Sequence, residues 1–136
     1  MTTDKLMEML EASPEHFRDA AFTADMQVSF GEYLTELMQE KSFDISRLIK
    51  EACLSRTYAY QFISGQRIPG RDIIIRIALA MQLDVETAQR MLAIAQKGTL
   101  YPKKRRDSVI LYCIHKKMKL DETNIVLQDV DEEPLL

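Results

Sequence analysis

The stretch CLSRTYAYQFISGQRIPGRDIIIRIALAM, residues 53–81, carries most of the information about the fold. Ser55 is a good N-cap for a helix, and Gly65 is the residue type that most easily takes the left-handed conformation that ends one. Pro69 and Gly70 separate this helix from the next, whose continuous apolar character predicts burial at the centre of the molecule. The stretch therefore predicts two helices joined by a short loop.

The first of these helices, residues 56–64, has an apolar and a polar side when its residues are placed at about 3.6 per turn. The apolar side holds Tyr58, Ala59, Phe62 and Ile63, which we expect in the core. The polar side carries groups suited to the major groove of DNA, because arginine pairs with guanine, glutamine with adenine, and a threonine methyl with that of thymine. These polar residues are Arg56, Thr57, Tyr60, Gln61 and Ser64.

Helical spacing of apolar residues continues on both sides, and strand-like alternation is weak. We predict helices from Phe30 to Met38 and from about Ile45 to Ala52. Asp84 is the predicted N-cap of a further helix, which reaches about Lys97 and stops at Gly98. In the N-terminal part, Ser13-Pro14 reads as the start of a further helix. The sequence therefore predicts an all-α fold.

A sequence similarity within the chain extends this pattern to the C-terminus. Arg71-Asp72, Leu83-Asp84 and Glu86-Thr87 recur as Arg106-Asp107, Leu120-Asp121 and Glu122-Thr123, with two more residues before the second Leu-Asp and one fewer after it. We therefore expect a second helical pair that resembles the fourth and fifth helices and packs back onto the domain. The predicted organisation is an acidic helical extension (1–28), a five-helix domain (29–98), and a C-terminal helical pair with a frayed tail (99–136).

The distribution of charge favours a nucleic-acid partner more than the net charge of −3 does. Residues 1–28 hold two basic and six acidic residues, whereas residues 45–76 hold six basic and two acidic ones, a net charge of +4. Cys53 and Cys113 lie in apolar runs, which favours buried free thiols and a cytoplasmic protein. No apolar run approaches the roughly 20 residues of a membrane span, and the N-terminus does not resemble a signal peptide.

Residues 53–81 resemble the lambda-repressor-like helix-turn-helix family, also called the Cro/cI or XRE type. The family pattern falls on Cys53 and Leu54 at the turn, Ser55-Arg56-Thr57, Ala59 and Phe62, Gly65-Gln66-Arg67, Pro69 and Ala78. The similarity covers roughly residues 30–92 and implies a dimeric, sequence-specific transcriptional regulator that reads the major groove with helix 55–64. We expect base contacts from Arg56, Thr57, Tyr60 and Gln61, and phosphate contacts from Arg47, Ser55, Ser64, Gln66 and Arg67.

Three points stay open at this stage. Cys53 stands where the family usually has glycine, so either it adopts a positive φ or the turn shifts. Tyr60 either stacks on the sugar-phosphate backbone or packs against the preceding helix. The homodimer surface is unassigned, with Val109, Leu111 and Tyr112 as the first candidate.

The main alternative is a protein-interaction adaptor on the same scaffold, with weak or no DNA binding. It is favoured by the acidic N-terminal segment, by the repeated helical pair, and by Ile45, preceded by Asp44, where the family often has a glutamine that bonds the DNA backbone. The sequence contains no glycine-rich phosphate loop, nucleophile elbow, metal-binding histidine pair or paired catalytic carboxylates. We therefore expect no enzymatic activity, no cofactor and no metal. The expected partners are double-stranded DNA and a second copy of the chain, with another protein as the partner in the adaptor alternative, and no membrane.

Overall fold

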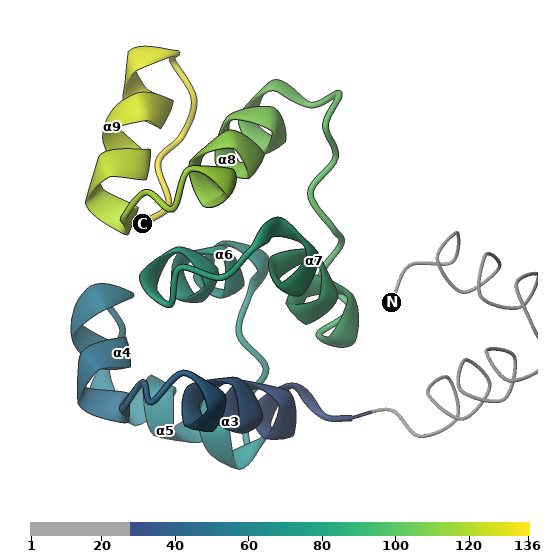
Figure 1. Ribbon diagram of the computed structural model, residues 1–136, viewed down its shortest axis with the longest axis vertical. Coiled ribbons are helices and arrows are strands. Elements are labelled where there is room, and N and C mark those ends of the chain that lie inside the picture. The colour runs from purple at the N-terminus through teal and green to yellow at the C-terminus, as the bar shows by residue number, and fades with distance from the viewer. Residues whose placement is uncertain (1–27) are drawn as a thin grey trace, which may run out of the picture.

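The computed structural model describes residues 28–136, which form seven helices and no strand. The predicted all-α fold is confirmed for this part of the chain, whereas the helix predicted after Ser13-Pro14 lies outside it. None of the described helices is long and apolar enough to span a bilayer. The helices in Figure 1 are α3 (Phe30–Glu40), α4 (Ile45–Glu51), α5 (Arg56–Ser64), α6 (Arg71–Ala80), α7 (Val85–Ile94), α8 (Arg105–His115) and α9 (Leu120–Asp129).

Local sequence explains where four of these helices begin. A side-chain oxygen of the N-cap residue accepts a hydrogen bond from the backbone N–H three residues later, which satisfies an N–H that has no partner within the helix. The predicted N-caps Ser55 and Asp84 are both confirmed. The four residues that cap in this way are Ser29, Asp44, Ser55 and Asp84.

Most of the described helices end on a left-handed residue that is not glycine. The N–H after this residue donates to a carbonyl five residues earlier, as from Phe43 to Met38 at 2.8 Å, which is the Schellman arrangement. In α7 this turn comes earlier than predicted: the helix ends at Ile94 because Gln96 already has a φ of 56°. Among the helices of residues 28–136, only α5 ends on a left-handed glycine, Gly65, as predicted. The non-glycine residues with positive φ are Ser42, Cys53, Gln82, Gln96, Lys117 and Asp131.

Helix α6 lies at the centre of the described part, as its apolar sequence predicts. In Figure 1 it runs between α3, α4 and α5 on one side and α8 and α9 on the other. It contacts α4, α7, α8 and α9, so little of its surface is left for solvent. Its buried residues are Ile74, Ile75, Ile77, Ala78, Leu79 and Ala80.

The pairs α6–α7 and α8–α9 repeat the same polar contacts at a constant spacing of 35 residues. Arg71 at the start of α6 donates to the carbonyls of Gly98 and Thr99. Arg106, 35 residues later, donates to the carbonyls of Glu133 and Pro134. Each arginine therefore fixes the segment that follows its own helical pair.

A second set of equivalent contacts closes each pair. The side-chain amide of Gln89 on α7 bonds both the N–H and the carbonyl of Leu100, at 2.7 and 2.9 Å. The amide of Asn124 on α9 does the same with Leu135, at 2.6 and 3.4 Å. Both leucines are buried, so each segment is anchored by polar and apolar contacts together.

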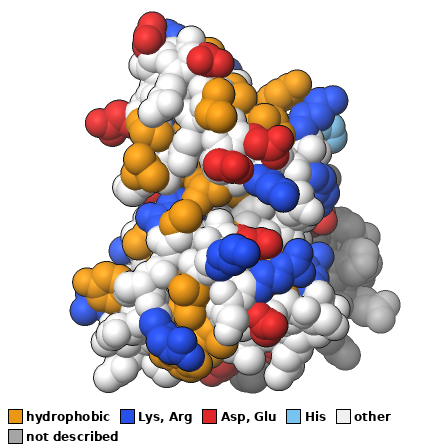
Figure 2. Space-filling view, turned by 90° about the vertical axis from the view of Figure 1, so that its left-hand side faces the viewer, with side chains coloured by type: hydrophobic (Ala, Val, Ile, Leu, Met, Phe, Trp, Pro, Cys, Tyr) orange, Lys and Arg blue, Asp and Glu red, His pale blue; other side chains and the backbone are white. Residues whose placement is uncertain are grey.

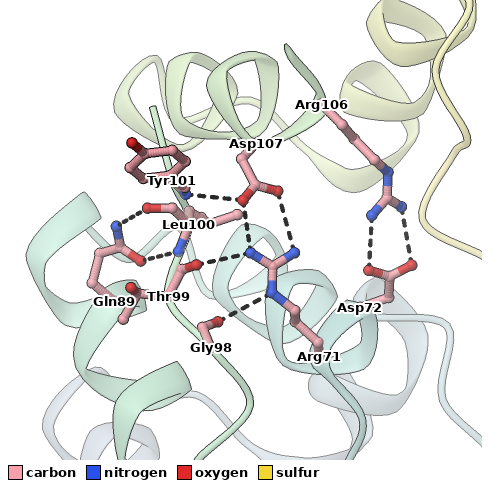
Figure 3. A network of polar contacts seen from close by, with 9 residues as sticks. All are labelled: Arg71, Asp72, Gln89, Gly98, Thr99, Leu100, Tyr101, Arg106 and Asp107. Carbon is pink, nitrogen blue, oxygen red and sulfur yellow. Dashed lines mark hydrogen bonds and ion pairs between the residues drawn. The ribbon is translucent and has the colours of Figure 1, made fainter. Parts of the chain in front are cut away.

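The two pairs also bond each other reciprocally. Arg71 forms an ion pair with Asp107 at 2.8 Å, and Arg106 forms one with Asp72 at 3.0 Å (Figure 3). At the other end of α6 and α8, the side chain of Gln82 donates to the Lys117 carbonyl and the ammonium of Lys117 donates to the Gln82 carbonyl. Each helical pair therefore makes the same contacts to the other. The interface between α6–α7 and α8–α9 resembles that of a two-fold symmetric dimer, although both pairs belong to one chain.

Two sequence predictions about this region are wrong. The constant spacing matches Asp84, the N-cap of α7, with Lys119, the N-cap of α9, and not with Asp121 as predicted. The C-terminal tail is not frayed, since Leu135 is fully buried and held by Asn124. The tail was predicted wrongly because the side chain that holds Leu135 lies 11 residues earlier, at Asn124, and no local pattern signals this contact.

Candidate nucleic-acid interface

The turn between α4 and α5 sets the direction of the candidate reading helix. Cys53 adopts a φ of 55°, so the first of the two alternatives for this position is the one observed. This conformation leaves the Cys53 side chain exposed and corrects its predicted burial, whereas Cys113 is buried; both thiols are free. The next residue, Leu54, is buried and donates its N–H to the Ile49 carbonyl at 3.0 Å.

An arginine from the central helix holds this turn in place. Arg76 on α6 donates to the carbonyl of Ala52 at 3.0 Å and also to the carbonyl of Cys53. These carbonyls lie at the end of α4, where the helix supplies no N–H partners. Arg76 therefore positions α4 and α5 relative to each other. The local sequence shows it only as one of the six basic residues between 45 and 76 and gives no sign of this role.

The inner side of α5 is fixed by close packing. Ala59 and Phe62 are buried, and Ile63 packs against the core. On the neighbouring α3, a Cβ at Gly31 would lie 2.7 Å from the Ile63 carbonyl oxygen and 2.9 Å from that of Phe62. Only glycine lets α3 approach the C-terminal end of α5 this closely, so the orientation of α5 depends on it.

The outer side of α5 carries three of the four predicted base-contact residues in open positions. Arg56, Thr57 and Tyr60 are all exposed, and Tyr60 keeps 48% of its surface accessible. The Arg56 guanidinium carbon lies 5.8 Å from the centre of the Tyr60 ring, within the range of a cation–π contact. Arginine, a hydroxyl group and a phenol thus share the N-terminal half of one helix face.

The fourth predicted residue, Gln61, is half-buried and bonded within the protein. Its side-chain oxygen accepts a hydrogen bond from Arg67 Nε at 3.0 Å. The Arg67 guanidinium in turn lies 4.9 Å from the centre of the Tyr58 ring. Tyr58 is 46% exposed, which corrects its predicted place in the core, although its ring stacks on that of Phe62.

The predicted phosphate-contact residues are all exposed, but most already have a partner. Arg47 lies 4.5 Å from the Phe43 ring centre and 3.4 Å from the Glu51 carboxylate. The Ser55 hydroxyl accepts the N-cap bond from Tyr58, and the Ser64 hydroxyl accepts from the N–H of Gln66. These serines therefore stabilise the ends of α5. The Ser64 hydroxyl also donates its hydrogen to the Gln61 carbonyl at 3.2 Å, so of the two serines only Ser55 has a hydroxyl hydrogen to donate to a phosphate.

Some of the basic residues in the positively charged stretch 45–76 make contacts within the protein. Of the six basic residues between 45 and 76, Arg71 and Arg76 make the internal contacts described above. On the side of the molecule where α4 lies, basic side chains are spread among apolar ones and do not form one continuous patch (Figure 2). The basic residues that remain exposed are Arg47, Lys50, Arg56 and Arg67.

Comparison with protein-family models, with curated proteins and with solved structures finds no match to this chain. Among residues 28–136, no group of three or more histidine, cysteine, aspartate or glutamate side chains could hold a metal ion. The candidate dimer surface is smaller than predicted, since Val109 and Leu111 pack against the core and only Tyr112 is exposed. The candidate site therefore consists of α5 and the residues that hold it in place, Gly31 and Arg76.

Proposed function

We propose that the chain is a sequence-specific DNA-binding regulator with a lambda-repressor-like helix-turn-helix in α4 and α5. The observation that supports the proposal most directly is that Arg56, Thr57 and Tyr60 are exposed on one side of α5, while its other side is packed in the core. A reading helix needs both properties, because base recognition depends on side chains held at fixed positions in the groove.

In this proposal the N-terminal half of α5 enters the major groove. Arg56 donates two hydrogen bonds to guanine O6 and N7, and the Thr57 methyl contacts that of thymine. Arg47 and Arg67 lie at the two ends of the α4–α5 unit and bind phosphates on either side of the groove. One such module offers a small interface, so two copies binding half-sites about one helical turn apart would supply the affinity that a regulator needs.

The test is enrichment of duplexes from a random-sequence pool at several salt concentrations, using the full chain. We expect one enriched motif, loss of preference at a single base position in Arg56→Ala, and a cost of about 1–3 kcal/mol for that variant on the enriched duplex. Lys116→Ala is the matched control, because it removes one exposed positive charge at the C-cap of α8, away from α5. It should leave every base preference unchanged.

A second candidate is a protein-interaction adaptor on the same scaffold. The observation that favours it is Asp44, whose carboxylate caps α4 with a 2.8 Å bond to the Arg47 N–H and places a negative charge where a phosphate would approach. If wild-type protein enriches no motif and shows only weak, steeply salt-dependent binding, the DNA proposal fails and the adaptor takes its place.

A further inference from the structure

The loop after α5 folds back on the helix and fixes the side chain of one reading residue. Gly65, with a φ of 84°, reverses the chain, and the Arg67 N–H then donates to the Gln61 carbonyl at 3.2 Å. Arg67 Nε donates to the Gln61 side-chain oxygen at 3.0 Å, with the guanidinium resting over the Tyr58 ring. Gln61 is thus held by Arg67 through both its backbone and its side chain.

This contact determines which way the Gln61 amide points. A guanidinium has only donors, so the group that faces it must be the amide oxygen. The amide is planar, which places its NH2 group on the opposite edge, away from Arg67. The hydrogens of that NH2 group are therefore what Gln61 offers to a base.

The consequence concerns base choice and rests on the DNA-binding function proposed above. Paired recognition of adenine by glutamine uses the amide oxygen as acceptor and the NH2 as donor together. Here Arg67 Nε occupies one of the two lone pairs of the amide oxygen, and the donors and positive charge of the adjacent guanidinium oppose the approach of an adenine NH2 group to the other. Among the bases, guanine alone presents two adjacent acceptors, O6 and N7, in the major groove. We propose that Arg67 biases Gln61 toward donation, so that Gln61 selects guanine in place of adenine.

The experiment is the random-pool enrichment run on wild type, Gln61→Ala, Arg67→Met and Arg67→Ala. The base position at which Gln61→Ala relaxes the preference identifies the contact of Gln61. Wild type should enrich guanine there. Both Arg67 variants free the amide oxygen and should move the preference toward adenine, changing the guanine-to-adenine ratio by about tenfold.

Controls separate this effect from a general loss of binding. Both Arg67 variants remove a positive charge, which lowers affinity for all sequences and reduces the salt dependence by about one phosphate contact. Gln66→Ala removes an exposed amide in the same loop that is predicted to contact phosphate, so it should lower affinity for all sequences and leave the base preference at the Gln61 position unchanged. Circular dichroism should show the wild-type helix content in each variant.

The outcomes of the two proposals differ. If wild type enriches a motif but prefers adenine at the Gln61 position, or if neither Arg67 variant changes the preference there, Arg67 does not set the choice of base and the DNA-binding function stands. If wild type enriches no motif, both proposals are overturned.

Discussion

The two reciprocal ion pairs between α6 and α8 allow a controlled test of how burial changes the contribution of an ion pair to the free energy of unfolding. The Asp107 side chain is 5% exposed and that of Asp72 is 42% exposed, although each binds an arginine with two hydrogen bonds. Replacing one charge of a buried pair costs about 3–5 kcal/mol, whereas exposed pairs contribute about 1 kcal/mol or less. The prediction is therefore that Asp107→Asn destabilises the protein much more than Asp72→Asn.

The expected loss of stability depends on the hydrogen bonds that remain in each variant. In Asp107→Asn, Arg71 keeps its bonds to the carbonyls of Gly98 and Thr99, and asparagine keeps one acceptor, so the loss lies near the lower bound, at about 3 kcal/mol. For a domain of this size, that loss lowers the Tm by roughly 12 °C. Asp72→Asn, the matched control, should cost about 1 kcal/mol.

The assay is urea unfolding followed by circular dichroism, with Tm measured in parallel. Equal losses in the two variants, or a larger loss for Asp72→Asn, would show that burial does not decide the contribution of these pairs. An unchanged m-value is needed for the comparison, because it shows that both variants unfold from states of similar compactness.

The same pair predicts a pH dependence. Burial raises the pKa of Asp107, but the hydrogen bonds from the Arg71 guanidinium and the Tyr101 N–H lower it by more, so the pKa in the folded protein lies below the ordinary value. The folded state thus favours the ionised carboxyl, and its contribution is present above the unfolded pKa of about 3.9. The stability difference between wild type and Asp107→Asn should be constant near neutral pH and shrink as the pH falls below about 4.

Three further substitutions test the residues that fix the position of α5. Gly31→Ala should destabilise the protein by about 2 kcal/mol, because the new methyl group would lie 2.7 Å from the Ile63 carbonyl oxygen; an unchanged or raised Tm would contradict this close approach. Cys53→Gly should raise the free energy of unfolding by about 1 kcal/mol, since glycine adopts the observed φ of 55° without strain, and a loss in urea unfolding would count against the turn described here. Arg76→Met should cost about 2 kcal/mol and weaken DNA binding, because the Ala52 and Cys53 carbonyls lose their charged donor; wild-type affinity in this variant would remove Arg76 from the positioning of α5.

Features encoded by neighbouring residues could be predicted from the sequence. Ser55 and Asp84 cap helices, and Gly65 ends one, because these contacts join residues three or four positions apart. The central burial of α6 follows in the same way from its composition. Periodicity also separated Ala59 and Phe62 from the exposed side of α5, which located the candidate reading residues.

Features that depend on distant contacts could not be predicted. Arg71 contributes to the net positive charge of residues 45–76, yet it is paired with Asp107, 36 positions away. Arg76 binds carbonyls 23 and 24 positions earlier, and no local pattern signals this contact. The exposure of Tyr58 could not be predicted from periodicity either, since its spacing puts it on the apolar side of α5 while its ring lies at the surface, 4.9 Å from the Arg67 guanidinium.

The most direct test of the central claim is a map of amide chemical-shift changes when the enriched duplex is added to isotopically labelled protein. We predict the largest changes between Ser55 and Arg67, with small changes over α8 and α9. Binding of the duplex with the largest changes in α8 or α9, and none in α5, would contradict the assignment of α5 as the reading helix.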